Sequence, residues 1–154
     1  MAQNPTITSL DAPQVTQRTF DVANDAVRVS VGSAEFIVSG ESLQAQGVVT
    51  ALTSGAAIPL VSCAGVNAFQ LYIVANTTTT GDLTVRLDLS PSATGTPLYQ
   101  TSLTLTLPGS SAEGAIVVST ILDTFIAAMA QVTIEANGLA GTDQATVFLI
   151  GNTF

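Results

Sequence analysis

Three charged side chains stand close together in the most regular part of the sequence: Asp82, Arg86 and Asp88. The two aspartates share the polar face of an expected strand, where six residues at ~3.3 Å each separate them by about 20 Å. Carboxylate pairs that hydrolyse glycosidic bonds are only about 5–9.5 Å apart. Arg86 lies between the aspartates on the same face. These residues therefore favour a solvated ion pair over an active site.

The chain lacks the side chains that usually activate a nucleophile, because it contains neither histidine nor lysine. No serine, threonine or cysteine then has such a base to remove its proton. We predict that the protein is not an enzyme, and we assign no catalytic residue and no cofactor. Calcium offers an alternative use for Asp82, or for Asp143 beside the 138–141 loop, because its ligands are oxygens. No regular spacing of acidic residues supports that alternative, so we interpret these aspartates as turn formers and assign no metal ligand.

Other residues that suggest chemistry or recognition have simpler structural interpretations. Cys63 is the only cysteine, which excludes an intramolecular disulfide, and we expect it to be a small buried hydrophobe. Asn76 begins a glycosylation sequon that we assign to an ordinary loop. Tyr72 lies in an apolar segment and is expected in the core. Tyr99 is the better candidate for an exposed aromatic platform that binds carbohydrate.

The composition indicates assembly. Charged residues make up 9% of the chain and hydrophobic residues 47%, and the mean hydropathy is +0.51. An average soluble domain has about 25% charged residues. So little charge predicts that the folded protein hides part of its surface against copies of itself or against other proteins. The net charge of −8 and the lack of a basic stripe argue against nucleic-acid binding.

A membrane segment is also not expected. Residues 116–134 are as long as a spanning helix, but they include Asp123 and several hydroxyl and amide side chains, and no lysine or arginine flanks them. The N-terminal residues lack the positive and apolar regions of a secretory signal. These patterns predict synthesis in a cytoplasm and no membrane partner.

Short alternating runs of β-branched and aromatic residues predict an all-β fold. Strict alternation marks strands at 26–31, 82–89 and 102–107, and apolar runs mark buried strands at 69–75, 115–118, 131–136 and 145–151. Turn-forming residues place loops at 76–81, 90–95 and 137–141. The spacing in 121–130 predicts one short helix or 3₁₀ turn. Together these elements predict a β-sandwich or jelly-roll-like domain.

The first part of the chain differs from the rest. Residues 1–34 are more polar, and we expect them to form an extended arm and a strand, followed by a sandwich domain over 35–154. An extended arm gains main-chain hydrogen bonds by adding to a neighbour's sheet, while Ile7, Leu10 and Val15 fill pockets there.

The segment 20–29, FDVANDAVRV, resembles a phrase near the N-termini of small structural proteins of tailed bacteriophages. The resemblance implies a virion component, most concretely a capsid decoration or cement protein made in the bacterial cytoplasm. It also implies a homotrimer that contacts the major capsid protein or other virion proteins. The predicted interface residues are Phe20, Asp21, Asn24, Asp25, Val27 and Arg28.

Other assignments stay open at this point. The same features fit a neck, tail or fibre component, including a fibre-tip module that binds a receptor or glycan. They also fit a bacterial surface or spore-coat trimer of the tumour-necrosis-factor-like jelly-roll type. Such trimers usually follow a collagen-like stalk, and no Gly-x-y repeat is present here.

Overall fold

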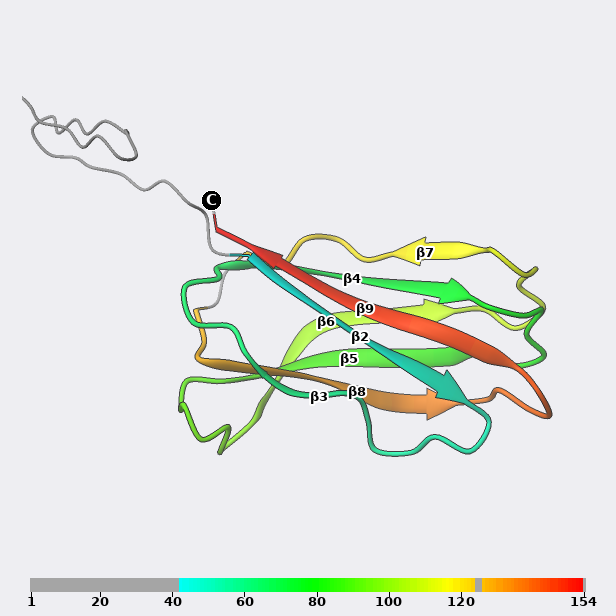
Figure 1. Ribbon diagram of the computed structural model, residues 1–154, viewed down its shortest axis with the longest axis horizontal. Coiled ribbons are helices and arrows are strands. Elements are labelled where there is room, and N and C mark those ends of the chain that lie inside the picture. Colours follow the sequence, from blue (N-terminus) through cyan, green and yellow to red (C-terminus); the bar gives the residue numbers. More distant parts are fainter. Residues whose placement is uncertain (1–41, 124–125, 154) are drawn as a thin grey trace, which may run out of the picture. The chain divides into compact units, whose positions relative to one another are not determined.

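The computed structural model describes residues 42–123 and 126–153, and these residues form two four-stranded antiparallel sheets (Figure 1). No helix occurs within these two ranges. The fold predicted from the sequence, an all-β sandwich, is confirmed. The strands are β2 (Ser42–Thr50), β3 (Ala56–Ser62), β4 (Ala68–Ala75), β5 (Leu83–Ser90), β6 (Tyr99–Leu107), β7 (Ile116–Val118), β8 (Met129–Asn137) and β9 (Gln144–Asn152).

The strand order is that of a jelly roll. One sheet has the order β2-β9-β4-β7 and the other the order β3-β8-β5-β6. Among the described strands, only β5 and β6 follow each other within one sheet, and every other connection crosses to the opposite sheet. Successive segments therefore alternate between the two layers, as in jelly rolls. Strands far apart in sequence, such as β2 and β9, come to lie side by side.

The core lies between the sheets and consists of the inward residues of each alternating strand. On β4 these include Phe69, Leu71 and Ile73, which are buried, and on β5 they include Leu83 and Leu87. Burying a side chain of this size contributes about 1.5–3 kcal/mol. Because the period of a strand is two, the intervening residues must point away from the core. Any partner protein would therefore contact the outward-facing residues of the strands.

Six of the predicted strands are confirmed, as β4 to β9. β2 and β3 were not predicted, and both have a physical reason. The outward positions of β2 carry Gln44 and Gln46, and Gly47 takes an inward position, so its hydrophobic alternation is weak. β3 contains Pro59, which is tolerated because β3 is an edge strand whose pairing with β8 shifts register there.

The helix predicted over 121–130 is wrong for the residues described there. Leu122 forms an isolated bridge with Phe69, with nitrogen-to-oxygen distances of 2.8 and 2.9 Å in the two directions. Met129 and Ala130 already belong to β8. Backbone pairing with β4 overrides the helical spacing, because the chain must cross back to the other sheet at this end. The predicted arm and the strand at 26–31 lie outside the described residues.

Candidate functional site

The six interface residues predicted from the sequence, Phe20, Asp21, Asn24, Asp25, Val27 and Arg28, lie outside the described residues, as do Ile7, Leu10 and Val15. Their role therefore stays a prediction. The described residues present a surface that sequence reasoning missed, on the outer side of the sheet β2-β9-β4-β7.

This sheet carries no charged side chain in any of its four strands. The acidic residues of the described ranges lie in loops or on the other sheet, at Asp82, Asp88, Glu113, Asp123, Glu135 and Asp143. We call the outward positions of this sheet, apart from the end positions of β2, β4 and β9, the uncharged face. It comprises Gln44, Gln46, Val48, Gln70, Tyr72, Val74, Ile116, Val118, Thr146, Phe148 and Ile150.

Strand register sets these side chains in rows across the sheet. Phe148 on β9 lies opposite both Gln46 on β2 and Tyr72 on β4, and Tyr72 lies opposite Val118 on β7. The next row runs Val48, Thr146, Val74 and Ile116. Directly opposed residues on one face have Cβ atoms only about 4.5–5.5 Å apart. The two rows therefore form an uncharged band across all four strands, with six apolar or aromatic side chains, the uncharged polar Gln46 and Thr146, and the two aromatic rings in the middle.

Part of this band is open to solvent. Ile116 is 60% exposed, Val48 52% and Val118 46%, which is high for side chains of this kind. Beside the band, a shallow hollow of about 260 Å³ is lined by Gln44, Ala45, Gln46, Phe148 and Ile150. A second hollow of about 120 Å³ shares Ile150 and extends to Phe69, Gln70 and Ile121. Val48 lies at one edge of the sheet and Ile116 and Val118 at the other, so the exposed apolar side chains flank the partly buried aromatic rings. Exposed apolar side chains on a surface without charge are typical of sites that bind another protein.

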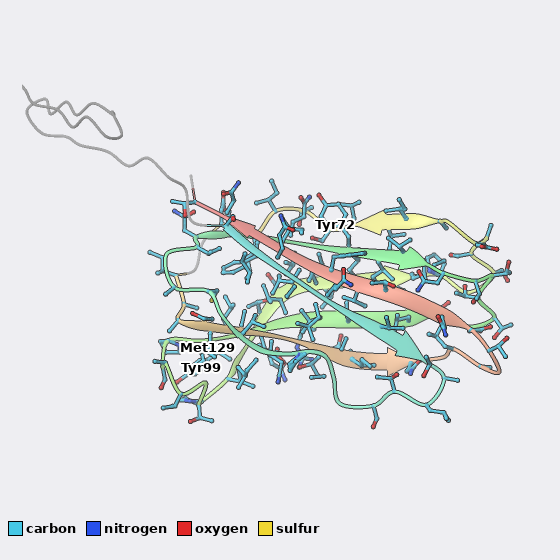
Figure 2. All side chains as sticks on the ribbon, viewed as in Figure 1. Tyr72, Tyr99 and Met129 are labelled. Carbon is cyan, nitrogen blue, oxygen red and sulfur yellow. The ribbon has the colours of Figure 1, made fainter. Side chains whose placement is uncertain are left out.

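Tyr72 belongs to the uncharged face, so its predicted place in the core is wrong. It alternates with the buried Leu71 and Ile73 and is only partly buried, beside β7 (Figure 2). Its hydroxyl donates to Oε1 of Gln70 at 3.0 Å, and Nε2 of Gln70 donates to the carbonyl oxygen of Ser119 at 2.9 Å. These two hydrogen bonds hold the Tyr72 ring in the uncharged face. Tyr99 is 57% exposed, as predicted, at the start of β6.

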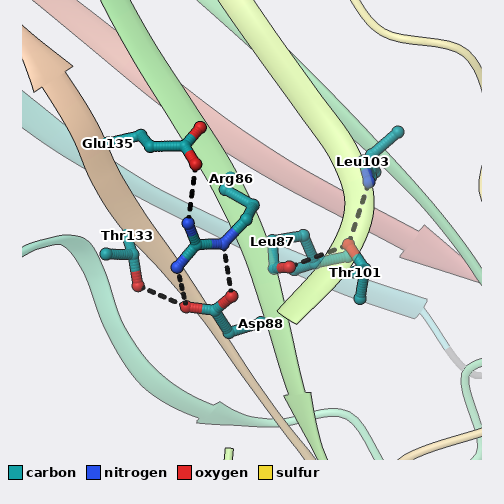
Figure 3. Close-up of polar contacts among 7 residues, drawn as sticks. All are labelled: Arg86, Leu87, Asp88, Thr101, Leu103, Thr133 and Glu135. Atoms are coloured by element: carbon teal, nitrogen blue, oxygen red, sulfur yellow. Dashed lines mark hydrogen bonds and ion pairs between the residues drawn. The ribbon is translucent and has the colours of Figure 1, made fainter. Parts of the chain in front are cut away.

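The outer side of the other sheet holds the charged cluster (Figure 3). Arg86 donates from Nε to Oδ1 of Asp88 at 2.8 Å and from Nη1 to Oε2 of Glu135 at 2.8 Å. Thr133 donates to Oδ2 of Asp88 at 2.6 Å. The side chains of Arg86 and Asp88 are only 13% and 7% exposed. The predicted ion pair of Arg86 and Asp88 is therefore confirmed, but the expectation that it is solvated is wrong, since the sheet and its neighbours shield it. The Asp88 hydrogen bond is the main reason that the pKa of Arg86 is raised.

The other candidate residues serve the fold. Oδ2 of Asp143 accepts hydrogen bonds from the Thr80 amide at 2.8 Å, the Thr80 hydroxyl at 2.7 Å and the Ala140 amide at 3.1 Å. Asp82 accepts from the Gly109 amide at 2.6 Å. In the sequon, Nδ2 of Asn76 donates to Thr146 at 2.8 Å. No group of three potential metal ligands is found among the residues with defined positions.

Cys63 is buried at 2% exposure, as predicted. Its Sγ donates to the carbonyl oxygen of Ala127 at 3.5 Å, and burial raises the pKa of the thiol to about 11. A thiol with such a pKa stays protonated and is a poor nucleophile. No helix of the described ranges is long and apolar enough to span a membrane.

Comparisons with known proteins leave this surface without a named counterpart. No family model matches the chain, and no curated protein matches it. Among solved structures, the globular domain of zebrafish complement 1qA protein is similar at 8% sequence identity and a TM-score of 0.37. That match covers 74% of this chain and 98% of the other. At this TM-score, the likeness carries no argument about function.

Proposed function

We propose that this protein is a non-enzymatic structural component of a bacteriophage virion, most concretely a capsid decoration or cement protein. The observation that carries the proposal is the uncharged face, a sheet surface without charge that exposes apolar side chains and is suited to protein contacts. The N-terminal FDVANDAVRV segment supplies the link to phage structural proteins. In this proposal the protein stabilises the assembled head through contacts with itself and with the major capsid protein.

The charge distribution favours one surface of the domain for contact between copies of the chain. The net charge of −8 makes two copies repel one another at most orientations. The uncharged face is a sheet surface on which close approach brings no like charges together. Phe148 and Tyr72 are the central anchors, because aromatic residues in the middle of an interface dominate its energy. We therefore propose a homo-oligomer, as a trimer, that assembles through this face.

Two alternatives have a specific observation in their favour. The jelly-roll connectivity favours a bacterial surface or spore-coat trimer, which would use the same face for assembly. The exposed Tyr99 favours a fibre-tip module that binds glycans. Neither alternative requires attachment to a phage head.

The test measures mass and shell binding together. Light scattering of the full chain should give a multiple of the 15.6 kDa monomer mass. Ile116→Glu and Phe148→Glu place a carboxylate in the uncharged face and should lower that mass to the monomer's. Ser102→Glu, at an exposed position of β6 on the other sheet, is the matched control and should not.

Each protein is then added to undecorated phage shells. Wild type and Ser102→Glu should coat the shells, and the two face variants should not. An oligomer that leaves shells bare rejects decoration but keeps self-assembly, and a glycan array then tests the fibre alternative. A wild-type monomer that ignores shells rejects both parts of the proposal.

A further inference from the structure

The fold requires a glycine at position 138. Gly138 follows β8 and packs against the loop 76–82, where a Cβ on Gly81 would collide with the Gly138 carbonyl oxygen. A Cβ on Gly138 would itself lie 2.9 Å from the carbonyl oxygen of Asp82. Both neighbours are backbone atoms, which cannot move aside as a flexible side chain can. Any side chain at 138 would therefore push the two segments apart.

The fold equally requires an amide at position 137. Nδ2 of Asn137 donates to the carbonyl oxygens of Thr50 at 2.9 Å and Thr53 at 3.0 Å, and so holds the β2–β3 connection. Oδ1 of Asn137 accepts from the Leu139 amide at 3.1 Å. A carboxylate can only accept, so aspartate could not replace the two donated bonds. Packing thus dictates the dipeptide Asn137-Gly138.

This dipeptide has intrinsic chemistry. The Gly138 nitrogen can attack Cγ of Asn137, because glycine has no side chain to hinder the approach. The N–Cγ bond forms, the Cγ–Nδ2 bond breaks, and ammonia leaves with the proton of the Gly138 nitrogen. Water then opens the succinimide ring at either carbonyl, which gives aspartate or isoaspartate. No enzyme and no reactant other than water is needed.

In the folded protein both reacting groups are held. The Gly138 N–H donates to the carbonyl oxygen of Asp82 at 2.7 Å, and the leaving Nδ2 is bound to two carbonyl oxygens. We propose that Asn137-Gly138 is a deamidation site gated by the fold: native packing suppresses the reaction, and opening of this end of the sandwich releases it. The product then prevents the loop from docking again. A carboxylate at 137 would face the oxygens of Thr50 and Thr53, and isoaspartate would add a methylene to the main chain.

The test follows deamidation by peptide mapping in a mass spectrometer, on the full chain in buffer and in guanidinium chloride. We expect Asn137 to react at least about tenfold more slowly in buffer, which corresponds to an opening free energy of ~1.4 kcal/mol. Asn76, followed by the β-branched Thr77, is the internal control and should react far more slowly in denaturant. Equal rates at Asn137 in both solutions would overturn the gating.

Two variants test separately whether native packing controls the reaction rate and whether the product destabilises the fold. Asp143→Asn weakens the same loop end through Thr80 and Ala140, so it should speed the reaction in buffer and not in denaturant. Asn137→Asp imitates one product and should lower the melting temperature or prevent folding. A melting temperature equal to that of wild type would refute the second half of the proposal.

Discussion

Phe148 and Tyr72 lie directly opposite one another on β9 and β4, at the centre of a sheet face without a charge. Aromatic cross-strand pairs stabilise a sheet by about 0.2–1 kcal/mol relative to alanine pairs. A monomer gains this stabilisation whether or not the neighbouring Ile116 and Val118 are exposed. In the proposed assembly, a second molecule covers these two side chains.

Assembly through the uncharged face should not weaken in salt. Raising sodium chloride to about 1 M shortens the screening length to ~3 Å, which removes the repulsion between copies at −8 and leaves apolar contacts intact. We expect the dissociation constant, measured by sedimentation, to stay constant or fall. A dissociation constant that rises with salt would mean that ion pairs hold the oligomer.

Removing the arginine of the charged cluster should destabilise the domain strongly. Arg86→Met leaves the 7% exposed Asp88 side chain without its cation, and such a change typically costs about 3–5 kcal/mol. The free energy of unfolding from guanidinium titration measures it. The double variant Arg86→Met with Asp88→Leu should recover much of the loss. A single variant as stable as wild type would show that Thr133 alone satisfies Asp88.

Acid should loosen the loop end that Asp143 holds. Hydrogen bonds from the Thr80 hydroxyl, the Ala140 amide and the Thr80 amide lower the pKa of Asp143 below its ordinary 3.8. Its stabilising contribution is therefore complete above 3.8 and is lost as the pH falls through the lower folded-state pKa. As the pH is lowered below 3.8, the melting temperature should fall less for Asp143→Asn than for wild type. Parallel curves for the two proteins would assign the acid sensitivity to other carboxylates.

Cys63 should resist thiol reagents in the folded state. Its exposure is 2% and its pKa is about 11, so little thiolate exists at neutral pH and reagents cannot reach it. Labelling with a chromogenic disulfide should therefore follow global unfolding, with the same denaturant midpoint as the circular dichroism signal. Rapid labelling in buffer would reveal a local opening between β3 and β4.

Much of the fold was predictable because its strands alternate cleanly. In β5, Leu83 and Leu87 face the core while Thr84 and Arg86 face outward, so the sequence alone indicates the strand and its faces. β2 was not predicted, because its outward glutamines and its inward glycine weaken the alternation of apolar and polar residues. The helix at 121–130 was wrong because a bridge to Phe69, which depends on tertiary structure, sets the backbone at Leu122.

The candidate site was less predictable, because it depends on strand order. Tyr72, Phe148 and Val118 are separated by many residues, and only the order β9-β4-β7 places them in one row. Each strand separately looks like ordinary apolar sheet. The signal that could have found the face is the lack of any charge in 68–75 and 144–152 together, read as two neighbouring strands.

In the proposed assembly, the separation of charge between the two sheets gives the domain one side that associates, the uncharged face, and one side that carries Arg86, Asp88 and Glu135. A particle built in this way grows only until its uncharged faces are covered, because the charged sides offer no further attachment. A ring of copies that turn their uncharged faces inward closes on itself, in contrast to open head-to-tail growth into fibres. The sparse charge of the chain is thus compatible with a finite particle and does not require that the protein aggregate.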